Sequence, residues 1–96
     1  MSPALPGDWH YVYLLSGKKT LWIYIGCTSN LEKRLKEHNK GECASTKRML
    51  PVELIYYEVY KSKDCAYKRE KSLKDYGSAL SKLKCRLGIN KKGRAG

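Results

Sequence analysis

One helix predicted in this sequence carries two chemically active side chains on its apolar face. With a rotation of about 100° per residue, one side of a helix over residues 31–39 gathers Leu31, Arg34, Leu35 and His38. Arginine binds phosphate oxygens with a planar fork of donors, and histidine exchanges protons near neutral pH. Both also have ordinary explanations, because a long cation can reach water past leucines and a histidine suits a helix C-terminus.

A second predicted helix places a carboxylate on its apolar side. The same rotation brings Glu70 into line with Ala66, Leu73 and Lys74. An unpaired buried carboxylate is costly and tends to lose its charge, so a cationic partner is expected. Two partners are open at this point: Lys74, one turn further along the helix, and a divalent metal ion.

The net charge points to an anionic partner. The chain has 96 residues, with 20 Lys and Arg against 9 Asp and Glu, and a formal charge of +11. This length suits one domain with one modest core. So large a basic excess favours nucleic acid as the partner, although charge that only keeps a small protein soluble is the plainer alternative.

The sequence also indicates the cellular environment of the protein. No apolar run approaches the length of a membrane span, and the N-terminal residues MSPALPGDWH lack a signal-peptide pattern. We therefore expect a soluble intracellular protein, cytoplasmic or associated with the nucleoid or nucleus, with no membrane partner. The four cysteines stand far apart, which favours free thiols over a disulfide framework or a zinc site.

Three strands are predicted from aromatic and β-branched runs. HYVYLLS at 10–16 and LWIYIG at 21–26 flank the turn GKKT and predict a hairpin. PVELIYYEVY at 51–60 is apolar on both alternations, which predicts a third strand that is buried for much of its length.

Capping residues predict where the first helix begins and ends. Ser29 or Asn30 can cap the helix over residues 31–39, and Gly41 follows its end. The small and polar residues at 40–50 predict a loop.

Two further helices follow the third strand. The second begins at residue 62 or 64 and runs to about residue 76, where Gly77 can take the left-handed conformation that ends it. The third covers residues 78–87, and a basic flexible tail occupies 89–96. The order β-β-α-β-α-α predicts an α+β fold in one domain over residues 1–96, with its core at about 10–88.

Several short motifs occur together on these elements. Tyr11-Val12-Tyr13 lies in the first strand and Tyr24-Ile25-Gly26 in the second. The later matching positions are Asn30, Arg34, His38, Asn39, Ala66 and Glu70. In this arrangement the chain resembles the GIY-YIG endonuclease family, and most closely its small stand-alone, single-domain members. The resemblance runs from about His10 to Leu87, with Cys27 standing where some members have a lysine.

The resemblance implies a fold, an activity and a role for each matching residue. The fold is a small antiparallel sheet of three strands flanked by helices, and the activity is metal-dependent hydrolysis of phosphodiester bonds in DNA. Glu70 would bind a single Mg²⁺ or Mn²⁺ ion, and Arg34 would hold the scissile phosphate. Tyr13 and Tyr24 would position and activate the attacking water, and His38 would assist by hydrogen bonding or proton transfer.

A tyrosine base raises a physical difficulty. A phenol has a pKa near 10, and lowering it to neutrality takes about three units, or roughly 4 kcal/mol. A divalent ion, Arg34 and a nearby lysine could supply this together. Tyr13 is the favoured base, with Tyr24 as its hydrogen-bonding partner, but the sequence does not decide between the two.

Further basic residues are expected to form the nucleic-acid footprint: Lys33, Lys36, Lys40, Lys47, Arg48 and Lys74. We find no recognised base-reading motif, so recognition is expected to be structure-directed or weakly sequence-specific, in DNA repair or processing. A protein partner could supply targeting. The alternative functions are a non-catalytic nucleic-acid-binding module of the same fold and a small ribosome-associated basic protein.

Overall fold

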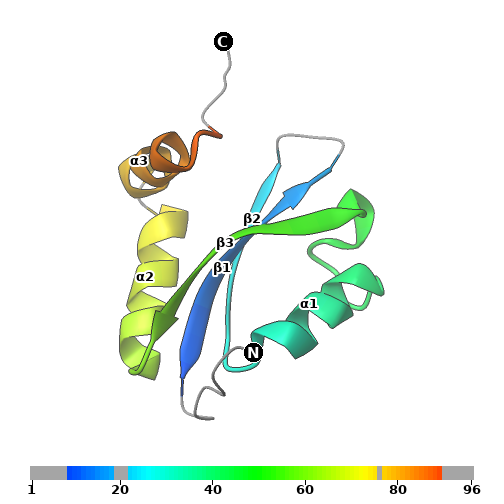
Figure 1. Ribbon diagram of the computed structural model, residues 1–96, viewed down its shortest axis with the longest axis horizontal. Helices are drawn as coiled ribbons and strands as arrows, with labels where there is room; N and C mark the ends of the chain where they lie inside the picture. The colour runs from blue at the N-terminus through cyan, green and yellow to red at the C-terminus, as the bar shows by residue number, and fades with distance from the viewer. Residues whose placement is uncertain (1–8, 19–21, 76, 90–96) are drawn as a thin grey trace, which may run out of the picture.

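A three-stranded antiparallel sheet forms the centre of the protein in a computed structural model that describes residues 9–18, 22–75 and 77–89. Its strands are β1 (His10–Gly17), β2 (Ile23–Thr28) and β3 (Val52–Tyr60). The spatial order is β2-β1-β3, so the first strand is central and the other two form the edges (Figure 1). The predicted α+β class and the order β-β-α-β-α-α are confirmed.

Helices cover the two faces of this sheet. Helix α1 (Leu31–Asn39) lies on one side, and α2 (Lys63–Asp75) and α3 (Gly77–Leu87) lie on the other (Figure 1). A short 3₁₀ helix, η1 (Lys47–Met49), stands before β3. Both faces of the central strand are therefore shielded from solvent.

Successive side chains of β1 point to opposite faces of the sheet, and they divide the apolar core in two. Val12 and Leu14 are fully buried and pack with residues of α2 and α3. Tyr13 and Leu15 are equally buried on the opposite face, where their neighbours include Leu35 of α1. The strand thus directs an aromatic hydroxyl into the face that α1 covers.

Several predicted boundaries need correction. The second strand extends to Thr28 because its ladder with β1 continues to the pair Tyr11 and Thr28. The loop predicted at 40–50 contains η1. The prediction that Gly77 ends the second helix in a left-handed conformation is wrong, because Gly77 instead begins α3.

The prediction that the third strand is buried for much of its length is wrong, because β3 is an edge strand in which only Val52 is buried. The capping and cysteine predictions are confirmed. Of the two candidate caps, Asn30 is the one used, and its side chain accepts a hydrogen bond from the amide of Lys33 at 3.0 Å. Gly41, which follows the end of α1, has a positive φ angle of 78°. All four cysteines are free thiols.

Parts of the predictions fall outside the described ranges. These are residues 19–21, with half of the hairpin turn and the expected start of the second strand, residue 76 and the tail at 90–96. Within the ranges that are described, no helix combines the length and the hydropathy needed to cross a bilayer.

Candidate active site

The phenol of Tyr13 lies at the centre of the candidate site. Tyr13 is fully buried in β1, directly opposite Gly26 of β2. A Cβ atom added at Gly26 would lie 2.5 Å from the hydroxyl oxygen of Tyr13. The glycine therefore leaves the space that the tyrosine ring occupies.

His38 of α1 meets this phenol. It is fully buried, and its Nε2 lies 2.9 Å from the Tyr13 hydroxyl oxygen. Its Nδ1 lies 2.8 Å from the hydroxyl of Thr46, in the loop before η1. Burial, and secondly the charge of Arg34, lower the pKa of His38, so the imidazole is neutral at pH 7.

The hydrogen bonds around His38 define its tautomer. The hydroxyl of Thr46 donates to the carbonyl of Cys43 at 3.5 Å, so its oxygen accepts the proton of His38 Nδ1. A neutral imidazole then keeps a lone pair on Nε2, and the Tyr13 hydroxyl donates to it. His38 is thus oriented as an acceptor for the proton of Tyr13.

Arg34 lies one turn before His38 and closes the site toward solvent. Its Nη1 donates to Glu37 Oε1 at 2.8 Å, and its Nη2 contacts Cys43 Sγ at 3.5 Å. Hydrogen bonds with Glu37 and with Tyr13 raise the pKa of the guanidinium. The side chain of Arg34 is 35% exposed, so it extends from the buried hydroxyl of Tyr13 to the protein surface.

The environment of Tyr13 opposes ionisation as the site stands. Burial raises the pKa of its phenol, although hydrogen bonding with Arg34 lowers it in part. This direction is the reverse of what a free tyrosinate base requires. A role for Tyr13 in taking up a proton therefore depends on passing its own proton to His38.

Tyr24 of β2 completes the aromatic group. Its ring centroid lies 5.1 Å from that of His38 and 6.2 Å from that of Tyr13. It is half-buried, so its side chain reaches the surface beside the buried pair. Four of the five predicted catalytic residues, Tyr13, Tyr24, Arg34 and His38, are thus brought together on the α1 face.

Glu70 approaches from the other face of the sheet. It lies on α2 and pairs with Lys74, with 3.1 Å between Oε2 and Nζ. Burial, and then the charge of Glu70, raise the pKa of the Cys27 thiol, which places the carboxylate beside β2. Tyr24 is on the same edge strand, so the two parts of the predicted site meet at β2 from opposite sides.

The side chains available as ligands determine how this site could hold a metal ion. Among the described residues, no group of three or more His, Cys, Asp and Glu side chains gathers as a ready-made cage. Mg²⁺ often needs only one or two carboxylates, and takes its other ligands from water and substrate phosphate. Glu70 is 22% exposed, and its partner Lys74 is exposed enough to turn away, so this carboxylate fits that mode of binding.

The predicted nucleic-acid-binding residues divide between two regions. Lys33 and Lys36 are exposed on the outer side of α1, and Lys40 follows its end. Lys47 and Arg48 are exposed in η1. These five surround the α1 face, whereas Lys74 lies with Glu70 on α2.

Sequence reasoning missed three contributors to the site. Thr46 and Cys43 belong to a segment without periodicity, and no sequence signal links them to His38. Glu37 is not on the predicted apolar face of the helix, yet its Oε1 lies 2.8 Å from Nη1 of Arg34. Its spacing of three residues from Arg34 is the signal that could have found it.

Comparison with known proteins shows the family to which the chain belongs. The GIY-YIG catalytic domain matches residues 9–84. The chain therefore belongs to the GIY-YIG family, a family of nucleases that act on DNA and generally use divalent metal ions.

The relatives within this family carry the name UPF0213. The UPF0213 protein of Haloquadratum walsbyi is 37% identical over 70 residues, covering 72% of this chain and 78% of that protein. The one from Staphylococcus haemolyticus is 42% identical over 76 residues, covering 78% and 90%. The solution structure of the UPF0213 protein BH0048 from Bacillus halodurans superposes with a TM-score of 0.52 at 24% identity, covering 92% of this chain and 99% of that one, and it shares the fold.

Proposed function

We propose that this protein is a Mg²⁺- or Mn²⁺-dependent endonuclease that hydrolyses phosphodiester bonds in DNA. The observation that carries the proposal is the hydrogen bond from the Tyr13 hydroxyl to the neutral, fully buried His38. A phenol held against a proton acceptor, with an arginine at the mouth of the same site, suits activation of water beside a phosphate.

This pair avoids the difficulty of a free tyrosinate. The phenol oxygen takes a proton from the attacking water while its own proton moves to His38 Nε2. The water oxygen bonds to phosphorus, the bond from phosphorus to the leaving oxygen breaks, and that oxygen takes a proton from solvent. Tyr13 stays neutral throughout, and His38 becomes a cation near an anionic phosphate.

The other residues bind and orient the substrate. Arg34 holds the scissile phosphate, and the half-buried Tyr24 hydrogen-bonds the incoming water from β2. Glu70, on the other side of the same strand, would hold the divalent ion, which when bound supplies charge stabilisation to the phosphate. The scissile phosphate then lies across the exposed edge of β2.

A test starts from Glu70→Gln. The amide keeps the shape of the side chain and loses the charge that holds a cation, so metal-dependent cleavage of labelled DNA should almost disappear while the fold persists. Asp75→Asn is the matched control, because Asp75 also lies on α2 and pairs with a lysine four residues away, at 2.8 Å. Equal cutting by Glu70→Gln and wild type at saturating Mg²⁺ would remove Glu70 from the site.

A non-catalytic nucleic-acid-binding module is the second candidate. The ion pair of Glu70 with Lys74 favours it, because it gives the carboxylate an ordinary partner. The two functions separate in a panel of linear, flapped, branched and single-stranded DNAs. Binding without nicks in Mg²⁺ or Mn²⁺ would support the module, whereas metal-dependent nicks support the nuclease. The same panel tests for structure-directed cleavage, as DNA repair or processing requires.

A further inference from the structure

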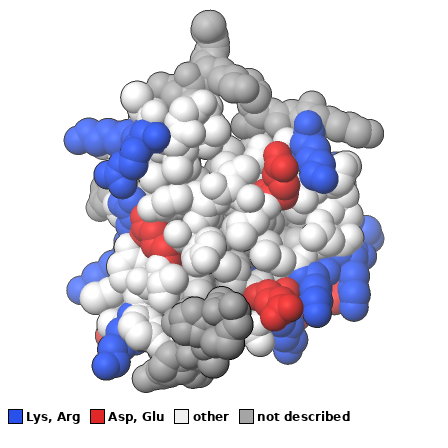
Figure 2. Space-filling view, in the orientation of Figure 1, with Lys and Arg blue, Asp and Glu red and all other residues white. Residues whose placement is uncertain are grey.

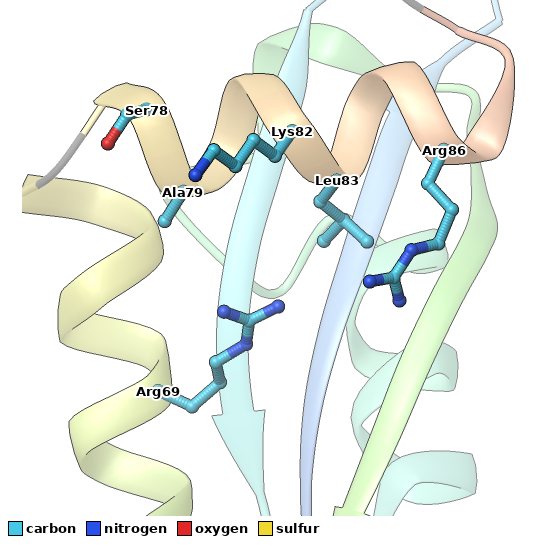
Figure 3. A pocket seen from close by; sticks show the side chains of 6 residues that line it. All are labelled: Arg69, Ser78, Ala79, Lys82, Leu83 and Arg86. Carbon is cyan, nitrogen blue, oxygen red and sulfur yellow. The ribbon is translucent and has the colours of Figure 1, made fainter.

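A cavity of about 300 Å³ lies between α2 and α3, on the opposite face of the sheet from Tyr13, Arg34 and His38. Its walls carry three cations, Arg69, Lys82 and Arg86, and the smaller side chains of Ser78, Ala79 and Leu83 (Figure 3). Arg69 points toward α3, and Arg86 points from α3 toward the sheet (Figure 3). The basic groups therefore converge on one space from two elements.

Arg69 is fixed in the wall of this cavity by Glu58 of β3. Glu58 accepts hydrogen bonds from Arg69 Nε at 3.1 Å and Nη2 at 3.0 Å, and from the hydroxyls of Tyr56 and Tyr60. Burial opposes the charge of Glu58, but these donors outweigh it and its pKa is lowered. None of the hydrogen bonds uses Nη1 of Arg69, so the guanidinium keeps donors for a second anion.

Lys82 and Arg86 are exposed on α3, one helical turn apart. Within the part of the chain that the structure describes, neither has an acidic side chain within 4.0 Å. Of the three cations, only Arg69 is paired with a carboxylate, and that carboxylate, Glu58, already accepts several hydrogen bonds. This excess of positive charge favours an anionic ligand with several acceptor oxygens, such as a phosphodiester.

The sheet separates the cavity from Tyr13, Arg34 and His38, whereas Glu70 lies on α2 directly after the cavity residue Arg69. The cavity lies on the α2 and α3 side, next to β3, whereas Tyr24 and Glu70 meet at β2, the opposite edge. Figure 2 shows basic side chains at both flanks of this face, on the side of α2 and α3 and on the side of α1, with a largely uncharged band between them.

We propose that this cavity binds a phosphate of the nucleic-acid backbone, distinct from the phosphate held at Arg34. The inference rests on the proposed function for the nature of the ligand. Because Arg34 lies on the α1 face of the sheet and the cavity lies on the α2 and α3 face, a nucleic acid that fills both positions passes around the sheet. The nucleic acid that fills both has a backbone that bends sharply or branches.

The test compares two doubly substituted proteins. Lys82→Gln with Arg86→Gln removes two charges from the cavity, and Lys61→Gln with Lys68→Gln removes two charges from exposed lysines outside it. Binding to a linear duplex and to a branched duplex of equal length is measured in EDTA over a range of salt, with thermal unfolding as the check on folding.

The cavity variant should bind the branched duplex more weakly and with a salt slope lower by about 0.9 for each phosphate that the protein no longer neutralises. Its binding to the linear duplex should match wild type, whereas the control pair should weaken both duplexes alike. Equal loss on the two duplexes, or no loss beyond the control, would overturn the second phosphate site.

The outcome is independent of catalysis. If the binding difference persists but Mg²⁺ and Mn²⁺ produce no nicks, the cavity assignment stands and the nuclease proposal fails. If cleavage occurs and the two variants bind alike, the cavity assignment fails and the nuclease proposal stands.

Discussion

Gly26 of β2 and Tyr13 of β1 are cross-strand partners that occupy the same space on the α1 face. A Cβ atom at Gly26 would lie 2.5 Å from both Cζ and the hydroxyl oxygen of Tyr13. Gly26 does not have a positive φ angle, so the position excludes other residues because of the ring and not because of backbone strain. The second tyrosine motif thus ends in glycine to leave room for the first.

Gly26→Ala should therefore displace the Tyr13 ring. We expect the free energy of unfolding to fall by about 1–3 kcal/mol, as in other overpacked cores, and cleavage to fall with it. Denaturant unfolding and single-turnover cleavage measure the two effects. Gly77→Ala is the control, because a Cβ there meets no atom within 4 Å. Normal stability and activity of Gly26→Ala would show that the ring moves freely, against the packing described.

Thr46 should act as a positioning residue for His38. Thr46→Val keeps the shape but leaves the buried Nδ1 proton without an acceptor, which should cost about 1–3 kcal/mol. The lost tautomer preference should slow single-turnover cleavage by about ten- to a hundredfold, part of what a proton-transfer group contributes. Thr46→Ser keeps the hydroxyl and should restore the rate. A purely structural threonine would lower stability without this rescue of the rate.

Arg34 should matter more for cleavage than for stability. Arg34→Ala removes the group that meets charge on the phosphate, so the cleavage rate should fall by about 10²–10³. Arg34→Lys should recover little, because a point charge does not reproduce the planar fork. The melting temperature should change little, since a partly exposed pair such as Arg34 with Glu37 contributes only about 0–1 kcal/mol.

Lys36→Ala is the matched control for Arg34, because it lies on the exposed side of the same helix. It should weaken DNA binding at low salt and leave the single-turnover rate unchanged. A folded and fully active Arg34→Ala protein would mean that Arg34 does not take part in cleavage and serves only to contact Glu37 and Cys43.

Stability should depend on pH through His38. Its pKa in the folded protein lies below the ordinary value of 6.5, because burial and Arg34 disfavour the cation. Between these two values the unfolded chain binds a proton that the folded chain does not. Stability is therefore fully present above about pH 6.5 and is lost as the pH falls toward the folded pKa, by at most about 1.4 kcal/mol per unit.

Urea unfolding between pH 7.5 and pH 5 measures this loss. His38→Gln retains hydrogen-bonding groups but does not titrate, so its stability should vary less over the same range. An identical pH dependence in the two proteins would mean that other groups carry it.

The sequence determined the order of the elements and the faces of the helices. Strand alternation and helical periodicity are local properties, so the placement of Arg34 and His38 beside Leu35, and of Glu70 beside Ala66 and Leu73, could be predicted from spacing. The prediction of a left-handed conformation for Gly77 is wrong for the same reason. Gly77 satisfies a local helix-ending rule, but in the folded chain it starts α3 instead.

Only the tertiary structure decided which of these residues act together. Strand order places β1 between β2 and β3, and this burial raises the pKa of Tyr13 and keeps His38 neutral. Packing across the sheet separates Glu70 from the group on α1 and brings Thr46, from a segment without pattern, to His38. Such contacts depend on distance through space and on the exclusion of water, and the spacing of residues along the chain specifies neither.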